Sequence, residues 1–195
     1  MVAQKKPVTN RNSIAIVAIF VLLSILACQF DLGGPAPPGE PISTQPEAAQ
    51  TLIQMWQAAI IDAATTGRVL VLLNETQLTS LLAQRMEANE NPALLEPQVF
   101  LRHDAIQIYG ITERGAFKAS ILLGITPVID AEGELTLDLT IADFGPIPAP
   151  SALKDTVSAI LTEAFTGTIG PLATGIRLTT IAISDGEMAI VGELR

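Results

Sequence analysis

Two long segments joined by a short acidic turn constrain the fold of this chain more than any other part. From Glu134 to Ile141 apolar and polar residues alternate strictly, the pattern of a strand with one buried face. The segment before it, 116–129, is long enough to pair with it, and Asp130-Ala-Glu-Gly133 supplies turn residues between the two. The sequence therefore predicts a long β-hairpin and an antiparallel sheet built around it.

Helices are predicted on both sides of this hairpin. Apolar residues at helical spacing predict a first helix over 46–65, and Asn74 with Gln77 three residues later forms a capping box that begins a second helix. Ser151 is a plausible cap for a third, amphipathic helix over 151–165. Further strands are expected at 68–73, 176–184 and 187–194, the last two joined by Asp185-Gly186. Residues 99–103 and 105–111 are expected to form two strands or one bent strand. Residues 46–195 are thus predicted to be one α+β domain with a single core.

The N-terminal residues predict export and membrane attachment. Lys5, Lys6 and Arg11 precede an uncharged apolar run that ends at Cys28, the only cysteine. This order is typical of a secretory signal peptide over residues 1–27. The last four residues, Ile25-Leu26-Ala27-Cys28, resemble the lipobox of bacterial lipoproteins, which implies lipidation of Cys28. The alternative is a single uncleaved N-terminal transmembrane helix, and both interpretations place the domain on the extracytoplasmic face of the cell membrane.

The segment between the anchor and the domain, residues 28–45, is rich in Pro and Gly and is predicted to be a tether that lifts the domain off the bilayer. Charge is distributed unevenly along the chain. Eight of the 11 basic residues and all 20 acidic residues follow Cys28, so this part carries a formal net charge of −12. Such a surface repels phosphate backbones, which predicts no nucleic-acid partner. Membrane contact is expected through the anchor or through apolar surface.

No arrangement of residues points to catalysis. The only histidine, His103, lies beside Asp104 at a corner between strands, and no Gly-x-Ser-x-Gly elbow accompanies them. Asp130, Glu132 and Glu134 alternate as in a calcium loop but lack its remaining ligands, which favours an acidic hairpin turn. The sequence predicts no catalytic residue, no metal site and no cofactor, and so a protein that is not an enzyme.

The aliphatic residues leave two alternatives open. Residues 121–123 are apolar on both faces of the long strand, and the third helix carries a broad aliphatic stripe. A sheet and helix of this kind either fill one core together or leave a groove between them for an acyl chain. The pattern of residues does not separate these two arrangements.

Several segments carry a resemblance to a known group of proteins. They are the 74–82 helix start (Asn-Glu-Thr-Gln-Leu-Thr-Ser-Leu-Leu), the long hairpin, the 145–153 helix entry (Gly-Pro-Ile-Pro-Ala-Pro-Ser-Ala-Leu) and the terminal hairpin over 178–192. With the N-terminal anchor, these segments resemble the LmeA-like and YpmS-like envelope proteins and their tubular lipid-binding (TULIP-type) fold. The resemblance implies a long twisted antiparallel sheet wrapped around an amphipathic helix, with N-terminal helices. It implies an aliphatic tunnel with these lining candidates: Ile121, Leu123, Leu137, Leu139, Leu153, Val157, Ile160 and Leu161.

The predicted function combines the anchor with this lining. We expect a membrane-anchored extracytoplasmic lipoprotein that binds a hydrophobic ligand, a lipid or acyl chain, in lipid handling of the cell envelope. The alternative is a non-catalytic interaction or assembly module with a fully packed core, whose protein partner the sequence does not identify.

Overall fold

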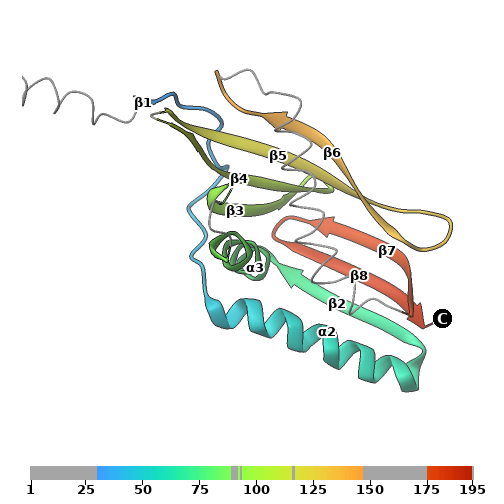
Figure 1. The fold of residues 1–195 in the computed structure, drawn as a ribbon. Coiled ribbons are helices and arrows are strands. Elements are labelled where there is room, and N and C mark those ends of the chain that lie inside the picture. Colours follow the sequence, from blue (N-terminus) through green and yellow to red (C-terminus); the bar gives the residue numbers. More distant parts are fainter. Residues whose placement is uncertain (1–29, 89–91, 93, 116, 147–174, 195) are drawn as a thin grey trace, which may run out of the picture.

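Two sheets and two helices make up the part of the chain that the structure describes (Figure 1). The computed structural model describes residues 30–88, 92, 94–115, 117–146 and 175–194. The larger sheet contains β1 (Phe30–Asp31), β3 (Leu95–Arg102), β4 (Ala105–Arg114), β5 (Phe117–Ile129) and β6 (Leu135–Asp143). The smaller sheet contains β2 (Arg68–Asn74), β7 (Ile176–Ser184) and β8 (Glu187–Leu194). The helices are α2 (Pro46–Thr66) and α3 (Glu75–Glu87), and together these elements confirm the predicted α+β class.

The strands of the larger sheet follow the order β1-β5-β4-β3, with β6 paired to the same edge of β5 as β1 but farther along it. The smaller sheet has the order β2-β8-β7. The two sheets meet where the Leu178 N–H of β7 donates to the Gly133 carbonyl in the β5–β6 turn, at 3.0 Å. Buried side chains from both sheets and both helices join in one hydrophobic cluster, with Trp56 as its largest member.

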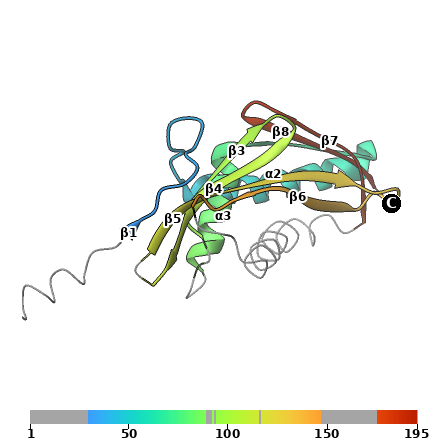
Figure 2. The same ribbon diagram turned by 90° about the horizontal axis from the view of Figure 1, so that it is seen from above.

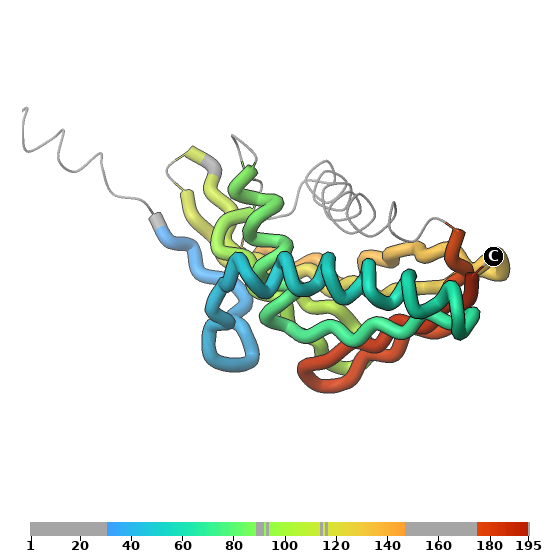
Figure 3. Tube along the Cα trace, turned by 90° about the horizontal axis from the view of Figure 1, so that it is seen from below, coloured from blue at the N-terminus to red at the C-terminus, as the bar shows by residue number. Residues whose placement is uncertain are grey.

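Both helices begin where the sequence predicts, and α2 ends one residue later than predicted, at Thr66. Pro46 starts α2, and Gly67 ends it with a left-handed φ of 69°, which a glycine adopts without strain. In α3 the Asn74 side chain accepts from the Gln77 N–H while the Gln77 side chain accepts from the Asn74 N–H, which confirms the capping box. Figure 3, which is seen from below, shows α2 running along β2.

The long hairpin of β5 and β6 is confirmed, but its register contains an irregularity that the alternation did not predict. Up to Leu139 the odd residues of β6 lie on the inner face, opposite Ile125, Pro127 and Ile129. The register then shifts between Gly124 and Ile125, so Ile141 pairs with Gly124. The prediction that Ile141 faces inward is therefore wrong, and its side chain is 42% exposed. Gly124 leaves room for the Ile141 side chain because it has no Cβ; a Cβ at this position would lie 2.8 Å from that side chain.

The segment before α2, which we call the strap (residues 30–45), follows the domain along much of its length. Near its start the Leu32 N–H donates to the Lys118 carbonyl at 2.9 Å, and the Gly33 carbonyl accepts from the Ser120 N–H at 3.0 Å. At its end the Gln45 N–H donates to the Ser80 hydroxyl of α3 at 2.9 Å. In Figure 2 the strap makes a loop between β1 and α2. A segment predicted to lift the domain off the bilayer is thus bonded to the domain near both of its ends.

Candidate functional site

Helix α3 lies against the edge of β3 that faces away from β4. Side chains of α3 accept hydrogen bonds from backbone N–H groups along this edge. The buried Thr79 hydroxyl accepts the Val99 N–H at 2.9 Å, and the Glu75 carboxylate accepts the Leu101 N–H at 2.8 Å. Glu75 also forms an ion pair with Arg102. An exposed strand edge offers unpaired N–H groups to other chains, and these contacts occupy it.

The spacing of these contacts shows where they must stop. Glu75 and Thr79 are four residues apart on the helix, about 6 Å, and their partners Leu101 and Val99 are two residues apart on the strand, about 6.6 Å. The next matched positions are Ala83 and Pro97. Proline has no N–H to donate and alanine has no polar side chain to accept one. Helix and strand therefore have no hydrogen bond to hold them together at this point.

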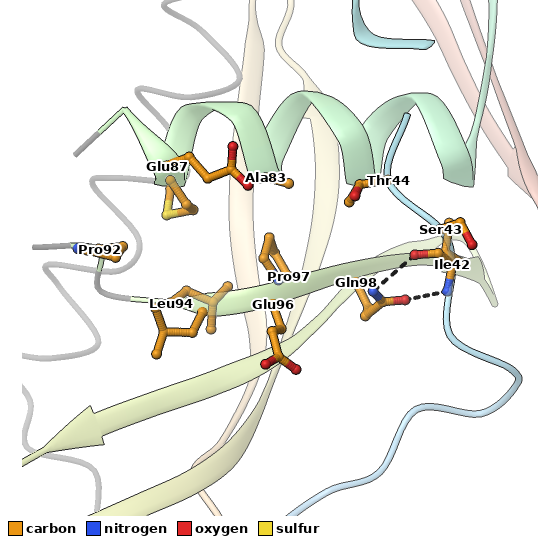
Figure 4. A pocket seen from close by; sticks show the side chains of 12 residues that line it. Ile42, Ser43, Thr44, Ala83, Glu87, Pro92, Leu94, Glu96, Pro97 and Gln98 are labelled. Carbon is orange, nitrogen blue, oxygen red and sulfur yellow. Dashed lines mark hydrogen bonds between the residues drawn. The ribbon is translucent and has the colours of Figure 1, made fainter. Parts of the chain in front are cut away.

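A pocket of about 400 Å³ opens at that position (Figure 4). This volume falls within the range of small-molecule sites, roughly 300–1,000 Å³. The pocket lies between the end of α3, the start of β3 and the strap. Its lining residues are Ile42, Ser43, Thr44, Ala83, Met86, Glu87, Pro92, Leu94, Leu95, Glu96, Pro97 and Gln98.

One wall of the pocket is the strap, which Gln98 holds in place. The Ile42 N–H donates to the Gln98 Oε1 at 2.5 Å, and the Gln98 Nε2 donates to the Ile42 carbonyl at 3.2 Å (Figure 4). The primary amide thus pairs with the backbone of Ile42 through both of its polar atoms, as a neighbouring strand would. This contact keeps residues 42–44 beside β3.

The lining of the pocket on β3 includes a strained residue. Glu96 has a φ of 48°, a left-handed conformation that costs a non-glycine residue about 1–3 kcal/mol. It lies where the register of β3 and β4 shifts, between Leu95 and Gln98. Such strain persists only when surrounding contacts impose it, and it concentrates at binding sites.

The chemical character of the pocket changes from its interior to its rim. Met86, Leu94 and Ala83 are almost fully buried and give an apolar interior. Glu87 and Glu96 are exposed, so two carboxylates lie at the rim. An apolar interior fits a hydrocarbon group, and the acidic rim favours a neutral or cationic group over an anionic one at the opening.

The pocket lies towards the same end of the large sheet as β1. Leu95 of the pocket is paired with Ile111, Ile111 with Ser120, and Ser120 is bonded to Gly33 of the strap. Three residues beyond Ile111, β4 ends at Arg114, and Phe117 at the start of β5 pairs with β1. At about 3.3 Å per residue, Leu95 and its partner Ile111 lie about 10 Å along the strands from that end of the sheet.

The residues predicted to line a tunnel lie elsewhere. Ile121 and Leu123 point into the packed core and are fully buried, while Leu137 and Leu139 are half-buried against it. None of these four lines the pocket. The remaining predicted positions lie outside the described residues: Cys28, Leu153, Val157, Ile160 and Leu161.

Two groups of polar residues considered as possible sites in the sequence lie in turns between strands. His103 and Asp104 form the two-residue β3–β4 turn with φ of 53° and 58°, and the shared positive sign is that of a type I′ turn. The Asp130 carboxylate accepts the N–H groups of Glu132 and Glu134, at 3.0 and 2.7 Å, within the β5–β6 turn. Among the described residues, no three His, Cys, Asp or Glu side chains are grouped as metal ligands would be.

The sequence did not indicate the pocket because the strand there was expected to begin at Val99. The signal that could have located it is Pro97, since a proline in a strand marks an edge position or a bulge. Within the described part of the chain, neither helix has the length and apolar character needed to cross a membrane. Comparison with known protein families and with characterised proteins gives no match.

Proposed function

We propose that this protein is a membrane-anchored lipoprotein of the bacterial cell envelope that binds a lipid or acyl chain in the pocket between α3 and β3. The observation that carries this is the pocket itself: about 400 Å³ with an apolar interior, placed towards the end of the large sheet where β1 pairs with β5. The predicted lipidation of Cys28 would keep the domain beside a source of such ligands. The acidic rim favours a lipid with a neutral or amine-bearing headgroup over a free fatty-acid anion.

The proposal is tested by photo-cross-linking. The full chain is reconstituted in vesicles that contain a phosphatidylethanolamine with a diazirine in its acyl chain, then irradiated, digested and mapped by mass spectrometry. Cross-links are expected on the peptides that contain Met86 and Leu94. Ala83→Phe fills the pocket and should reduce these cross-links, whereas Ala64→Phe, at an exposed position of α2, should leave them unchanged.

Because Ala83 is buried, folding of its variant is checked by the fluorescence of the single tryptophan, Trp56. Leu95→Glu, at a half-buried lining position, is a second way to make the pocket unfavourable for hydrocarbon. If both folded variants cross-link at the pocket as strongly as wild type, the pocket does not hold lipid. Cross-links on Leu137 and Leu139 instead would favour the TULIP-type arrangement, in which the hairpin wraps an amphipathic helix.

The second candidate function is the interaction module. Ile121 and Leu123 belong to a filled core, and on the outer face of the smaller sheet Leu70 and Leu72 are 59% and 53% exposed. Exposed aliphatic side chains in adjacent outward positions are typical of protein contact surfaces. Recurrent cross-linking of Leu72 to one envelope protein, lost in Leu72→Glu, would support this function.

A further inference from the structure

The chain enters the domain at one end of the large sheet, beside the β4–β5 turn. There Phe30 of β1 pairs with Phe117 of β5, and Asp31 pairs with Lys118. In the sequence only Gln29 separates Phe30 from Cys28, where the predicted lipid or apolar anchor ends. Two residues span at most about 7 Å. The anchor therefore has little free chain through which to separate from this end of the domain.

The strap is held tightly to β5 at this point. The hydrogen bonds of Leu32 and Gly33 to β5 continue the pairing of β1, and the Gly33 N–H also donates to the Asp31 carboxylate at 2.9 Å. Gly34 packs so closely that a Cβ there would lie 2.2 Å from the Ser120 carbonyl oxygen. The chain is thus fixed to β5 from Phe30 onward, and in the sequence only Gln29 lies between this fixed part and the predicted end of the anchor at Cys28.

The surface at this end is apolar without a dominant charge. Phe117 is 51% exposed and Leu32 is 37% exposed. Lys118 lies opposite Asp31 on one side and Glu113 on the other, so its charge is balanced by acidic neighbours. Aromatic and aliphatic side chains at such a surface favour the interfacial region of a bilayer.

We propose that this end of the domain, defined by Leu32 and Phe117, rests directly on the bilayer and fixes the orientation of the domain. The inference rests on the membrane attachment in the proposed function. It commits to a lipid surface as the partner because the predicted anchor ends at Cys28, two residues before Phe30, which pairs with Phe117, and four residues before Leu32. The pocket, about 10 Å away along the strands, is then held close to the headgroup region. Apolar contact, and not charge, holds this surface, so docking should not depend on anionic lipid.

Tryptophan quenching by brominated lipid tests this orientation. The full chain is reconstituted in phosphatidylcholine vesicles, with and without lipid brominated near the headgroup, in three single variants: Phe117→Trp, Leu32→Trp and Val128→Trp. Val128 is 40% exposed near the other end of β5, eleven residues from Phe117 and thus about 35 Å away. The buried Trp56 is present in all three and in wild type, which gives the background emission.

The added emission in Phe117→Trp and Leu32→Trp should fall about twofold with brominated lipid, because the indole would lie at the boundary of headgroups and acyl chains. The added emission in Val128→Trp should not change. The same pattern is expected when part of the lipid is replaced by phosphatidylglycerol.

Flotation of the vesicles separates the possible failures. If the chain floats with the vesicles but none of the variants is quenched above the wild-type background, or all three are quenched equally, the docking surface is refuted while the anchor stands. Quenching that requires phosphatidylglycerol would also refute it, because charge would then hold the domain. If the chain does not float, membrane attachment itself is refuted, and both proposals fail with it.

Discussion

The contact between α3 and the edge of β3 can be tested with one nearly isosteric change, Thr79→Val. Thr79 is fully buried and its hydroxyl accepts the Val99 N–H at 2.9 Å. Valine has almost the same shape, so the packing is preserved while the acceptor is lost. The change leaves a buried backbone N–H without a partner.

The expected destabilisation follows from that single unsatisfied group. A buried donor that loses its partner costs about 1–3 kcal/mol. For a urea m value of about 2 kcal/mol/M, a loss of 2 kcal/mol lowers the unfolding midpoint by about 1 M. Thr79→Ser keeps the hydroxyl and removes one methyl group, so it should cost only about 1 kcal/mol.

The assay is urea unfolding of the full chain in vesicles, followed by the emission of Trp56 in α2, which packs in the same hydrophobic cluster as α3. Thr51→Val is the matched control, because Thr51 is exposed and its hydroxyl donates to the Glu47 carbonyl at 2.8 Å within the helix. That change should stay within about 0.5 kcal/mol of wild type. Hydrogen exchange should show faster exchange of the Val99 amide in Thr79→Val alone.

Two results would contradict this expectation: Thr79→Val no less stable than Thr51→Val, or a Val99 amide as protected in Thr79→Val as in wild type. Either result would mean that α3 does not satisfy the edge of β3. The pocket could then not be explained as the place where the hydrogen bonds between α3 and β3 end.

Two further predictions concern the strained backbone of the β3–β4 turn and the pKa of a buried tyrosine. His103 and Asp104 both have positive φ, which costs most residues about 1–2 kcal/mol each. The double variant His103→Asn, Asp104→Gly places residues that favour this conformation in the turn, so it should raise the midpoint of urea unfolding. A lower midpoint would contradict the turn assignment. Burial raises the pKa of Tyr109, the only tyrosine, above 10.0, so ultraviolet titration should give a midpoint above that value. Its contribution to stability is present below pH 10 and is lost as the pH rises through the folded-state pKa; a midpoint at or below 10 would refute this.

Most of the regular structure was predictable because local signals determine it. The capping box at Asn74, the stop at Gly67 and the alternation from Leu135 to Leu139 each depend on residues close in sequence. Register irregularities are different. The shift at Gly124 depends on which residue of β6 opposes a glycine, and that pairing is not encoded in the alternation of either strand alone.

The strap and the pocket were not predictable for a related reason. Proline and glycine content shows that residues 30–45 bury little, but it does not show whether their backbone groups are bonded to the domain. The Gln98 contact with Ile42 joins positions 56 apart in sequence. Likewise, the pocket needs Ala83 to lie opposite Pro97, and no periodicity within either element indicates that match.

The strap connects the two proposals physically, because the same short segment touches the β1 end and forms a wall of the pocket. At its start, pairing with β5 fixes its position beside Phe117. At Ile42 it is held against β3 by the two hydrogen bonds of Gln98, and at Gln45 by the Ser80 hydroxyl. A ligand that enters the pocket must fit between this wall and the end of α3. The wall that a ligand would contact is thus built from the chain that leads to the proposed anchor, so ligand size is limited by how firmly Gln98 holds the strap.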